Sequence, residues 1–453
     1  MPSSFFSDML STLTDRSRAL LGLPRGPILG ADLPKYADQL LSRRGEASGV
    51  ALARTILDGY RAATPVARLA FLSELAGRFG PDPARLEAAI AAWRETGDAD
   101  AASDLALAAE ARRQELFRRL NLAPGGTSAL VRMRADLLAL LPDHPELACV
   151  DRDFTHLFAS WFNRGFLVLR HIDWTTPANI LEKIIRYEAV HEIRDWNDLR
   201  NRLEPTDRRC FAFFHPQLVD EPLIFVEVAL TTEMPAAIAP LLDLDRKPIP
   251  ASEANTAVFY SISNTQQGLG GVSFGNFLIK QVVDDLKREL PGLKTFVTLS
   301  PVPGFASWVK AQREEPDDAM IDPAVRRALA VLDDPGFVAD PARVEAARRA
   351  ILPAAAAYFL KARTQRGRPV DPVARFHLGN GARLERLNPL GDLSPKGLRQ
   401  SFGLMVNYCY DLDDIEANHE AFAEKGAVAA SRAVQRALKA DLAEGSSAMS
   451  APA

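Results

Sequence analysis

Two motifs far apart in this 453-residue chain carry side chains that could move protons. His377 stands just before Gly-Asn-Gly, where an expected strand turns, and Ser300 stands between an apolar run and a Pro-x-Pro-Gly turn. Histidine is the usual proton donor near neutral pH, and a hydroxyl fixed at the end of a strand is a common ligand contact. The two are therefore candidates for acid–base chemistry. The structural alternatives are a core histidine bonded to the backbone and a serine that caps a turn.

A glycine-dense segment follows an expected strand at 257–263 and leads into an expected helix that starts near Ser273. The first turn of a helix has free backbone N–H groups and a positive dipole end, and glycine lets a phosphate approach closely. The segment is not a P-loop, because no Gly-Lys-Ser/Thr closes it, and it is not a well-ordered dinucleotide fingerprint. It predicts an anion site built on four glycines: Gly268, Gly270, Gly271 and Gly275.

The same segment also fits the Gly-x-Ser-x-Gly pattern of a nucleophile elbow, with Ser273 as its serine. Ser273 and His377 would then form a hydrolase pair. An elbow serine lies on a sharp turn directly after its strand, whereas residues 264–272 intervene here. The hydrolase is therefore a minor alternative.

Metal-binding patterns are weak in this sequence. His191-Glu192 lacks the second histidine of a zinc helix, and the acidic run at 411–414 lacks the glycine and terminal glutamate of a calcium loop. The three cysteines are widely spaced, which predicts neither a disulfide framework nor a zinc site. We therefore expect no metal.

The composition is that of an ordinary globular protein, with 47% hydrophobic residues, 25% charged residues and a net charge of −4. A nucleic-acid binder of this size would usually carry a basic excess, so nucleic acid is not expected as a partner. No apolar run is long enough to span a bilayer, and the first residues lack the pattern of a signal peptide. We expect a cytoplasmic protein that does not engage a membrane.

Changes in composition divide the chain. Residues 1–148 are rich in Ala, Leu, Arg and Glu at helical spacing, which predicts an all-α helical bundle. Residues 149–425 hold apolar, β-branched and aromatic runs typical of strands, with a helical insertion expected at about 310–370. Residues 426–453, rich in Ala and Ser, are expected to be a flexible tail. The expected fold is an α+β chain of two domains.

A family resemblance emerges from the order of several motifs. Residues 267–271 come close to the Gln/Arg-x-x-Gly-x-Gly/Ala pattern with which acetyltransferase folds cradle the pyrophosphate of coenzyme A. Over residues 150 to 420 the chain resembles malonyl-CoA decarboxylases, including the stretch 401–410. The other pieces that carry the resemblance are FFHP (213–216), EPLIFVEVALT (221–231), FYSISNTQQGL (259–269), FGNFLIKQVV (274–283), LSPVPGF (299–305) and FHLGNGA (376–382).

This resemblance implies an N-terminal helical oligomerisation domain and a C-terminal α/β catalytic domain of acetyltransferase-like (GNAT-type) fold. It implies that malonyl-CoA is converted to acetyl-CoA and CO2 without a metal or organic cofactor. It also implies a homo-oligomer, with a tetramer as the expected state. The thioester itself delocalises the carbanion, so no separate electron sink is needed.

The resemblance also implies roles for individual residues. The catalytic pair falls on Ser300 and His377, and Ser261 and Tyr410 match positions near the reacting group. Animal members carry a glutamate where this chain has Ser273, so a carboxylate role there does not transfer. The implied CoA-binding residues are Gln267, Gly268, Gly270, Gly271, Val272, Ser273, Phe274, Gly275 and Asn276.

Two other functions remain open on the sequence. An acyltransferase of the same fold would need an acceptor amine or alcohol and a base to activate it. A non-enzymatic acyl-CoA sensor would bind coenzyme A without turnover, with the helical domain as its partner surface. The intact motifs around His377 and Ser300 favour the decarboxylase.

Overall fold

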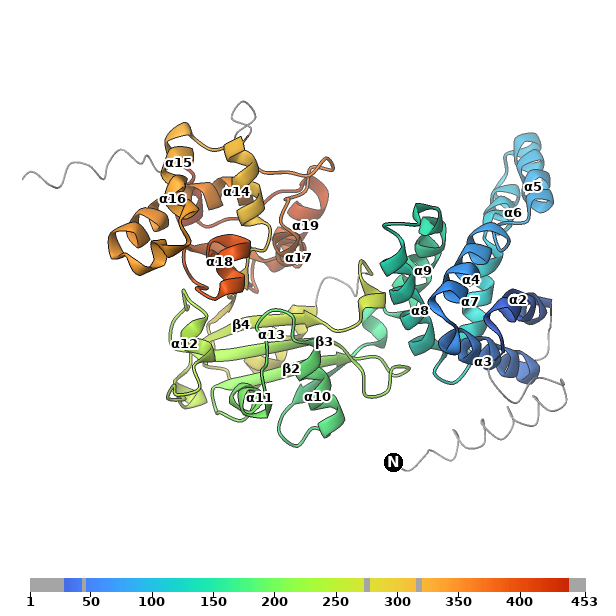
Figure 1. The fold of residues 1–453 in the computed structure, drawn as a ribbon, viewed down its shortest axis with the longest axis horizontal. Helices are drawn as coiled ribbons and strands as arrows, with labels where there is room; N and C mark the ends of the chain where they lie inside the picture. The colour runs from blue at the N-terminus through green and yellow to red at the C-terminus, as the bar shows by residue number, and fades with distance from the viewer. Residues whose placement is uncertain (1–27, 43–45, 273–277, 315–319, 440–453) are drawn as a thin grey trace, which may run out of the picture. The chain divides into compact units, whose positions relative to one another are not determined.

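The computed structural model describes residues 28–42, 46–272, 278–314 and 320–439 (Figure 1). The chain divides into two compact units. The helical unit comprises Met1–Val168, Phe214–Leu223 and Gln266–Phe274, and the sheet unit comprises Leu169–Phe213, Ile224–Thr265 and Gly275–Ala453. The chain is thus an α+β protein, with helices first and a mixed sheet after them, as the composition predicted.

Thr64, Asp82 and Asp98 begin helices of the helical unit, each as an N-cap whose side chain accepts a backbone N–H. Phe117 and Phe154 stack in the core of this unit with ring centroids 4.0 Å apart. The last helix of this unit, α9, begins at residue 148, where the composition placed the end of the bundle. The helices are α2 (Leu33–Ser42), α3 (Glu46–Ala62), α4 (Pro65–Gly77), α5 (Pro83–Thr96), α6 (Ala99–Ala109), α7 (Arg112–Asn121), α8 (Gly126–Leu140) and α9 (Ala148–Trp161).

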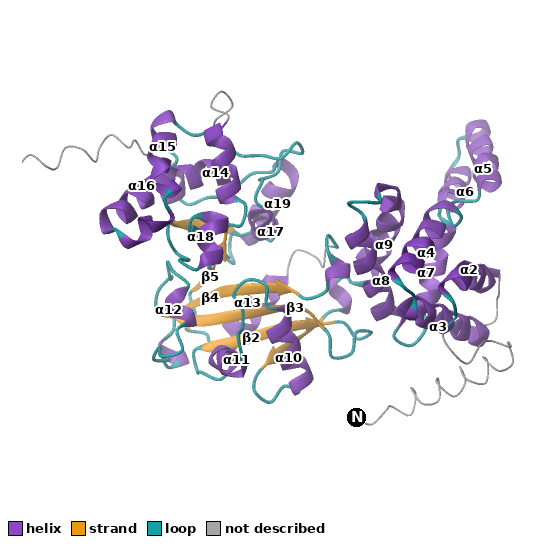
Figure 2. Ribbon diagram, viewed as in Figure 1, coloured by secondary structure: helices purple, strands orange, loops and turns teal. Residues whose placement is uncertain are grey.

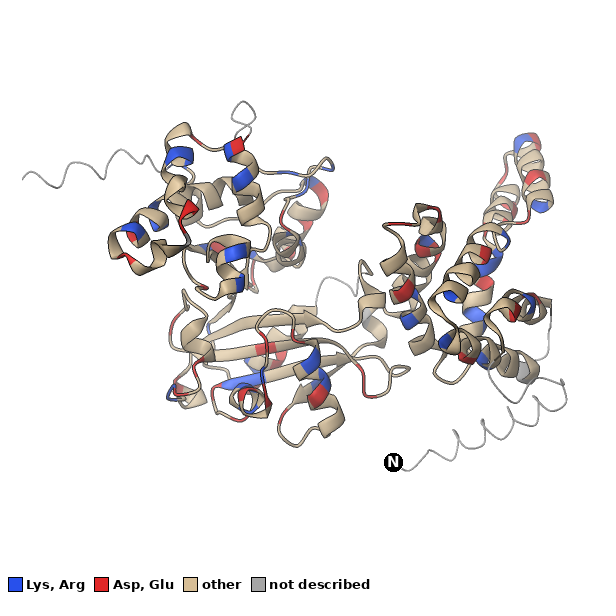
Figure 3. Ribbon diagram, viewed as in Figure 1, with Lys and Arg blue, Asp and Glu red and all other residues tan. Residues whose placement is uncertain are grey.

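Basic and acidic residues are interspersed along these helices (Figure 3). Arg78 and Arg112 both pair with the Asp38 carboxylate, at 2.6 and 3.0 Å. Exposed pairs of this kind contribute about 0–1 kcal/mol each. The helices therefore present charges of both signs, in keeping with the small net charge of the chain.

One mixed sheet organises the sheet unit (Figure 2). Its strand order is β1-β2-β3-β4-β5-β8-β6, with β7 also paired to β8. β3 runs antiparallel to β4, β4 runs parallel to β5, and β8 is antiparallel to its neighbours β5, β6 and β7. The strands are β1 (Val168–Ile172), β2 (Arg208–Phe214), β3 (Pro222–Thr231), β4 (Thr256–Asn264), β5 (Thr295–Thr298), β6 (Ser300–Pro301), β7 (Arg383–Asn388) and β8 (Met405–Cys409).

The central strands are buried on both faces, and the four runs expected at 210–216, 222–230, 257–263 and 295–299 are all confirmed as strands. Nine of the ten residues of β3 are buried, which requires cover on both sides of the sheet. The helices that accompany the strands are α10 (Ala178–Tyr187), α11 (Trp196–Leu203), α12 (Ala239–Leu242) and α13 (Leu278–Glu289). The helix expected to start near Ser273 is described from Leu278 onward, and Ser273 itself lies outside the described residues.

Helices occupy much of the region in which the helical insertion was expected, at about 310–370. Its principal helices are α14 (Phe305–Glu314), α15 (Pro323–Ala328) and α16 (Pro341–Leu360). The remaining helices of the unit are α17 (Pro372–Gly379), α18 (Pro395–Ser401), α19 (Ile415–Lys425) and α20 (Arg432–Ala437). None of the described helices is long and apolar enough to cross a membrane.

Two expectations about this region were wrong. His377 was expected where a strand turns, but it lies in the last turn of a helix, α17, because Asp371 and Pro372 form an N-cap signal that starts a helix six residues earlier. Residues after Gly426 were expected to fray, yet the Leu384 N–H donates to the Ala429 carbonyl at 2.9 Å, and α20 follows. Pairing with β7 orders this stretch through residue 439, and residues 440–453 of the expected tail lie outside the described residues.

Candidate active site

His377 is held between two hydroxyl groups inside the sheet unit. Its side chain is 3% exposed, and its Nδ1 lies 2.7 Å from the hydroxyl of Tyr410, just past the end of β8. Its Nε2 lies 3.2 Å from Ser300 Oγ. Three residues that the sequence singled out therefore meet at one place.

Ser300 is in turn anchored by the strand before it. Its Oγ donates to Thr298 Oγ1 at 2.9 Å, and the backbone N–H of Tyr408 donates to the same oxygen at 3.1 Å. Thr298 is fully buried at the end of β5. The Thr298 hydroxyl oxygen thus accepts two hydrogen bonds: one fixes the Ser300 side chain, and the other fixes the Thr298 hydroxyl against β8.

These hydrogen bonds determine which nitrogen of the His377 imidazole carries the proton. Because the Ser300 hydroxyl donates to Thr298, the contact between Ser300 and His377 requires Nε2 to carry a proton. Nδ1 then accepts from the Tyr410 hydroxyl. The ring of Tyr408 stacks on the imidazole, with centroids 4.5 Å apart and planes 25° apart, and fixes the plane of the ring.

Burial keeps this imidazole neutral. Desolvation lowers the pKa of His377 from 6.5 to about 3, since a buried imidazolium would lose its hydration. Burial also raises the pKa of the Tyr410 hydroxyl well above 10, so that it stays protonated and can donate. At neutral pH the resting site therefore offers a neutral N–H donor.

A cavity of about 180 Å³ opens at the Ser300 and His377 side chains. This volume suits a small acyl group and is below the range of about 300–1,000 Å³ typical of pockets for whole drug-sized ligands. Most of the lining is apolar. The lining residues are Val190, Ile224, Phe259, Tyr260, Ile262, Asn264, Ser300, Pro301, Val373, Phe376 and His377.

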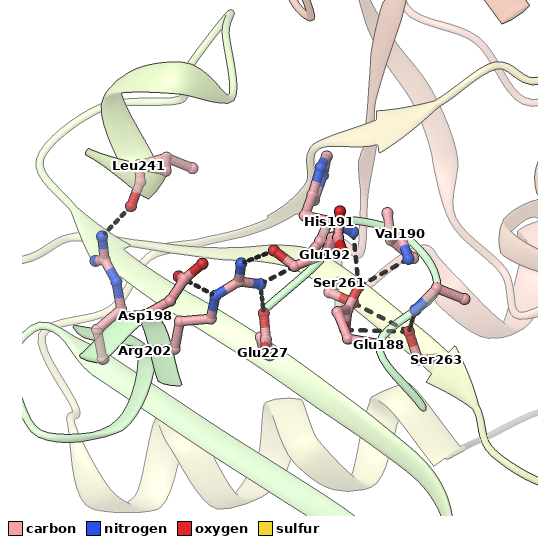
Figure 4. A network of polar contacts seen from close by, with 12 residues as sticks. Glu188, Val190, His191, Glu192, Asp198, Arg202, Glu227, Leu241, Ser261 and Ser263 are labelled. Atoms are coloured by element: carbon pink, nitrogen blue, oxygen red, sulfur yellow. Dashed lines mark hydrogen bonds and ion pairs between the residues drawn. The ribbon is translucent and has the colours of Figure 1, made fainter. Parts of the chain in front are cut away.

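Ser261 belongs to a different network (Figure 4). Its Oγ lies 2.9 and 2.7 Å from the two carboxylate oxygens of Glu188, and Ser263 Oγ donates to the same carboxylate at 3.2 Å. The backbone N–H groups of Val190 and His191 complete the cradle around Glu188. The structure therefore gives the Ser261 hydroxyl a carboxylate partner and does not bring it into hydrogen-bond contact with Ser300 or His377.

A buried ion pair continues this network. Arg202 donates to Glu227 Oε2 at 3.0 Å and to Asp198 at 3.2 Å, and Arg202 and Glu227 are almost completely buried. Burial raises the pKa of Glu227 to about 7, while the Arg202 guanidinium opposes that rise. This pair was not among the residues expected from the sequence, although Glu227 is the only charged residue in the otherwise apolar strand β3, which is the signal of a buried partner.

Five of the expected CoA-binding residues fall in the described part of the helical unit, and Ser273, Phe274, Gly275 and Asn276 lie outside the described residues. Gly268 packs against α8: a Cβ there would lie 1.8 Å from the Val131 carbonyl oxygen, and Arg134 donates to the Gly268 carbonyl at 2.8 Å. Gly271 has a φ of +75°, which favours glycine. At least Gly268 is therefore required by packing, whether or not a phosphate binds nearby.

Comparison with known families decides the class of the protein. The model of the malonyl-CoA decarboxylase C-terminal domain matches residues 165–448, and that of the N-terminal domain matches residues 79–162. The chain belongs to the malonyl-CoA decarboxylase family. The family resemblance seen in the motifs is thereby confirmed.

Individual members of the malonyl-CoA decarboxylase family are similar over much of the chain. The mitochondrial malonyl-CoA decarboxylase of Anser anser anser is 36% identical over 335 residues, which cover 69% of this chain and 66% of that protein. The mitochondrial enzyme of Mus musculus is 37% identical over 331 residues, which cover 68% of this chain and 67% of that protein. The matched part thus spans about two thirds of the length of these relatives.

Crystal structures of bacterial malonyl-CoA decarboxylases have the same fold. The structure from Rhodopseudomonas palustris is 65% identical with a TM-score of 0.87, covering 90% of this chain and all of that chain. The structure from Agrobacterium vitis is 60% identical with a TM-score of 0.86, covering 90% of this chain and 99% of that chain.

Proposed function

We propose that this protein decarboxylates malonyl-CoA to acetyl-CoA and CO2 at the cavity beside Ser300 and His377. The observation that carries this proposal is the fixed series of contacts from Tyr410 through His377 to Ser300, which ends at an apolar cavity of acyl size. Membership of the family supports the same substrate and reaction.

The apolar lining favours the loss of CO2. A malonyl carboxylate loses hydration when it enters an apolar cavity, whereas the CO2 that leaves is uncharged. The bond between C2 and the carboxyl carbon breaks, and its electron pair passes to the thioester oxygen as an enolate. The Nε2–H of His377 is the donor that can stabilise that oxygen, and Ser300, whose own proton is donated to Thr298, holds the imidazole in place.

One proton must then be added to C2. The resting imidazole carries a single proton because burial lowers its pKa. A malonyl carboxylate in the cavity brings a negative charge beside His377 and raises that pKa in the complex. We propose that the proton taken up with the substrate is the one that His377 transfers to C2, with Tyr410 holding Nδ1 during the transfer.

The proposal is tested with the purified protein and malonyl-CoA alone, by following CO2 and thioester products by mass spectrometry. Acetyl-CoA and CO2 in equal amounts support decarboxylation, and His377→Ala should remove most of the activity. His156→Ala is the matched control, because His156 is exposed on α9 in the helical unit. Free CoA with malonate would instead support the Ser273 hydrolase, and binding without turnover would support the sensor.

The alternative acyltransferase is tested in the same way. Malonyl-CoA or acetyl-CoA is incubated with candidate amines and alcohols, and an acylated acceptor would support it.

The homotetramer, the cytoplasmic location and the CoA-binding role of residues 267–276 remain proposals. Light scattering, cell fractionation and the KM of variants in the 267–272 segment test them.

A further inference from the structure

Tyr358 links the two segments that carry the catalytic pair. It lies near the end of α16, and its hydroxyl donates to Asp371 Oδ2 at 3.2 Å. The other oxygen of Asp371 accepts the backbone N–H of Ala374 at 2.7 Å. Asp371 is thus the N-cap of α17, the helix that presents His377. Tyr358 therefore holds the start of the His377 helix.

The ring of Tyr358 packs on the segment that follows Ser300. Its centroid lies 5.6 Å from that of Phe305 and 5.2 Å from that of Trp308, both on α14. A Cβ at Gly304 would lie 2.8 Å from the Tyr358 hydroxyl. A glycine at position 304 therefore leaves room for the hydroxyl to reach Asp371.

These contacts close a ring through the site. Gly304 follows Ser300 by four residues and lies against the Tyr358 hydroxyl, which donates to Asp371. Asp371 begins α17, and α17 carries His377. The 3.2 Å contact between His377 and Ser300 then completes the ring of contacts. Tyr358 and Asp371 are buried, at 2% and 1% exposure, and neither lines the 180 Å³ cavity. They can act on the reaction only through the residues that they hold.

We propose that Tyr358 and Asp371 form a positioning brace that sets the separation of Ser300 from His377. This inference rests on the proposed decarboxylation, because it concerns the geometry of that site. Small misplacements of reacting groups cost large factors in rate. Removing the Tyr358 hydroxyl leaves a buried carboxylate oxygen without its donor, and burial already raises the pKa of Asp371.

The first test is Tyr358→Phe. We expect kcat to fall by about 10-fold or more, since misplacement acts on the reacting geometry. KM should change by less than about twofold, since the brace does not touch the cavity. Tyr60→Phe is the matched control: Tyr60 is a buried tyrosine of the helical unit beside Asp136, it does not line the cavity, and the loss of its hydroxyl should leave both constants unchanged. An unchanged kcat in Tyr358→Phe would overturn the brace.

A double-mutant cycle separates the brace from general destabilisation. Gly304→Ala should lower kcat, because its methyl group displaces the Tyr358 hydroxyl. In the Tyr358→Phe background the hydroxyl is gone, so Gly304→Ala should lower kcat much less. Additive losses would overturn the brace. Failure of the unaltered protein to form acetyl-CoA would contradict the proposed function instead, so the two failures are distinguishable.

Discussion

The Nδ1 of His377 lies 2.7 Å from the hydroxyl of Tyr410, so the side of the imidazole remote from Ser300 already has a donor. The proton on Nε2 is therefore committed to the side where Ser300 and the cavity lie. The buried Tyr410 hydroxyl thus determines that the imidazole presents its proton on the nitrogen that faces the cavity.

Tyr410→Phe removes the donor to Nδ1. The imidazole can then place its proton on either nitrogen, and only one tautomer presents an N–H to the cavity. We expect kcat to fall by about 10- to 100-fold, which is less than the roughly 10²–10⁴-fold of a full general acid–base contribution, because the imidazole itself is retained. KM should change little. Steady-state kinetics with malonyl-CoA measure both constants, and an unaltered kcat would show that Tyr410 has no part in the reaction.

Thr298→Val removes the acceptor that fixes Ser300. The Ser300 hydroxyl and the Tyr408 N–H lose a shared partner, and a buried donor without a partner costs about 1–3 kcal/mol of stability. The Ser300 proton is then free to turn toward His377, so we expect a lower kcat. Thr298→Ser keeps the oxygen and should retain most of the activity. Equal kcat values in the two variants would contradict this role for the hydroxyl.

Acid should destabilise the folded protein through His377. Its pKa is about 3 in the folded state and about 6.5 when unfolded, so the unfolded state binds more protons between these values. The contribution of this neutral imidazole to the free energy of unfolding is fully present above pH 6.5. As the pH falls from 6.5 toward the folded pKa, the free energy of unfolding decreases by about 1.4 kcal/mol per pH unit.

Urea unfolding of the unaltered protein and His377→Gln at several pH values measures this effect. The variant should lose less stability between pH 6.5 and pH 4.5, whereas His156→Gln, at an exposed site, should behave like the unaltered protein. Parallel pH dependences for the unaltered protein and His377→Gln would contradict the buried neutral state.

Gly268→Ala tests whether this glycine is required by packing. Its Cβ would lie 1.8 Å from the Val131 carbonyl, so α8 or the loop must move, at a cost of about 1–3 kcal/mol. Gly77→Ala is the control, because a Cβ there meets nothing within 4 Å and alanine suits a helix. Thermal unfolding should show a lower Tm for the first variant only. The KM of Gly268→Ala for malonyl-CoA tests the proposed CoA-binding role of the loop.

The pairing of Ser300 with His377 was predicted through the family resemblance, which the dense motifs around both residues carry, and the structure brings the two side chains within 3.2 Å. The sequence also predicted the central strands, whose apolar runs are long and rich in β-branched residues. The helix that carries His377 was missed even though Asp371-Pro372 is a start signal, because the following Gly-Asn-Gly was interpreted as the turn of a strand. At this position the start signal of Asp371-Pro372 outweighs the turn signal of Gly-Asn-Gly.

Other parts of the site have no local cue. The carboxylate that bonds Ser261 comes from Glu188, 73 residues away, and nothing in either segment indicates the other. The same holds for Arg202 and Glu227, which meet only when α11 packs beside β3. Family resemblance placed Ser261 near the reacting group, but it could not show that a carboxylate already accepts its hydroxyl. Such long-range pairings are set by tertiary packing.

Ser300 and His377 are separated by 77 residues of chain, and helices α14, α15 and α16 lie between them. Bringing the two ends of so long a segment together costs conformational entropy, and the packing of the segment must offset that cost. During refolding, activity should therefore return after the helical circular-dichroism signal, once this segment has docked. The contact between Ser300 and His377 is in that sense a late kinetic marker of complete folding, and catalysis reports when the last part of the unit has closed.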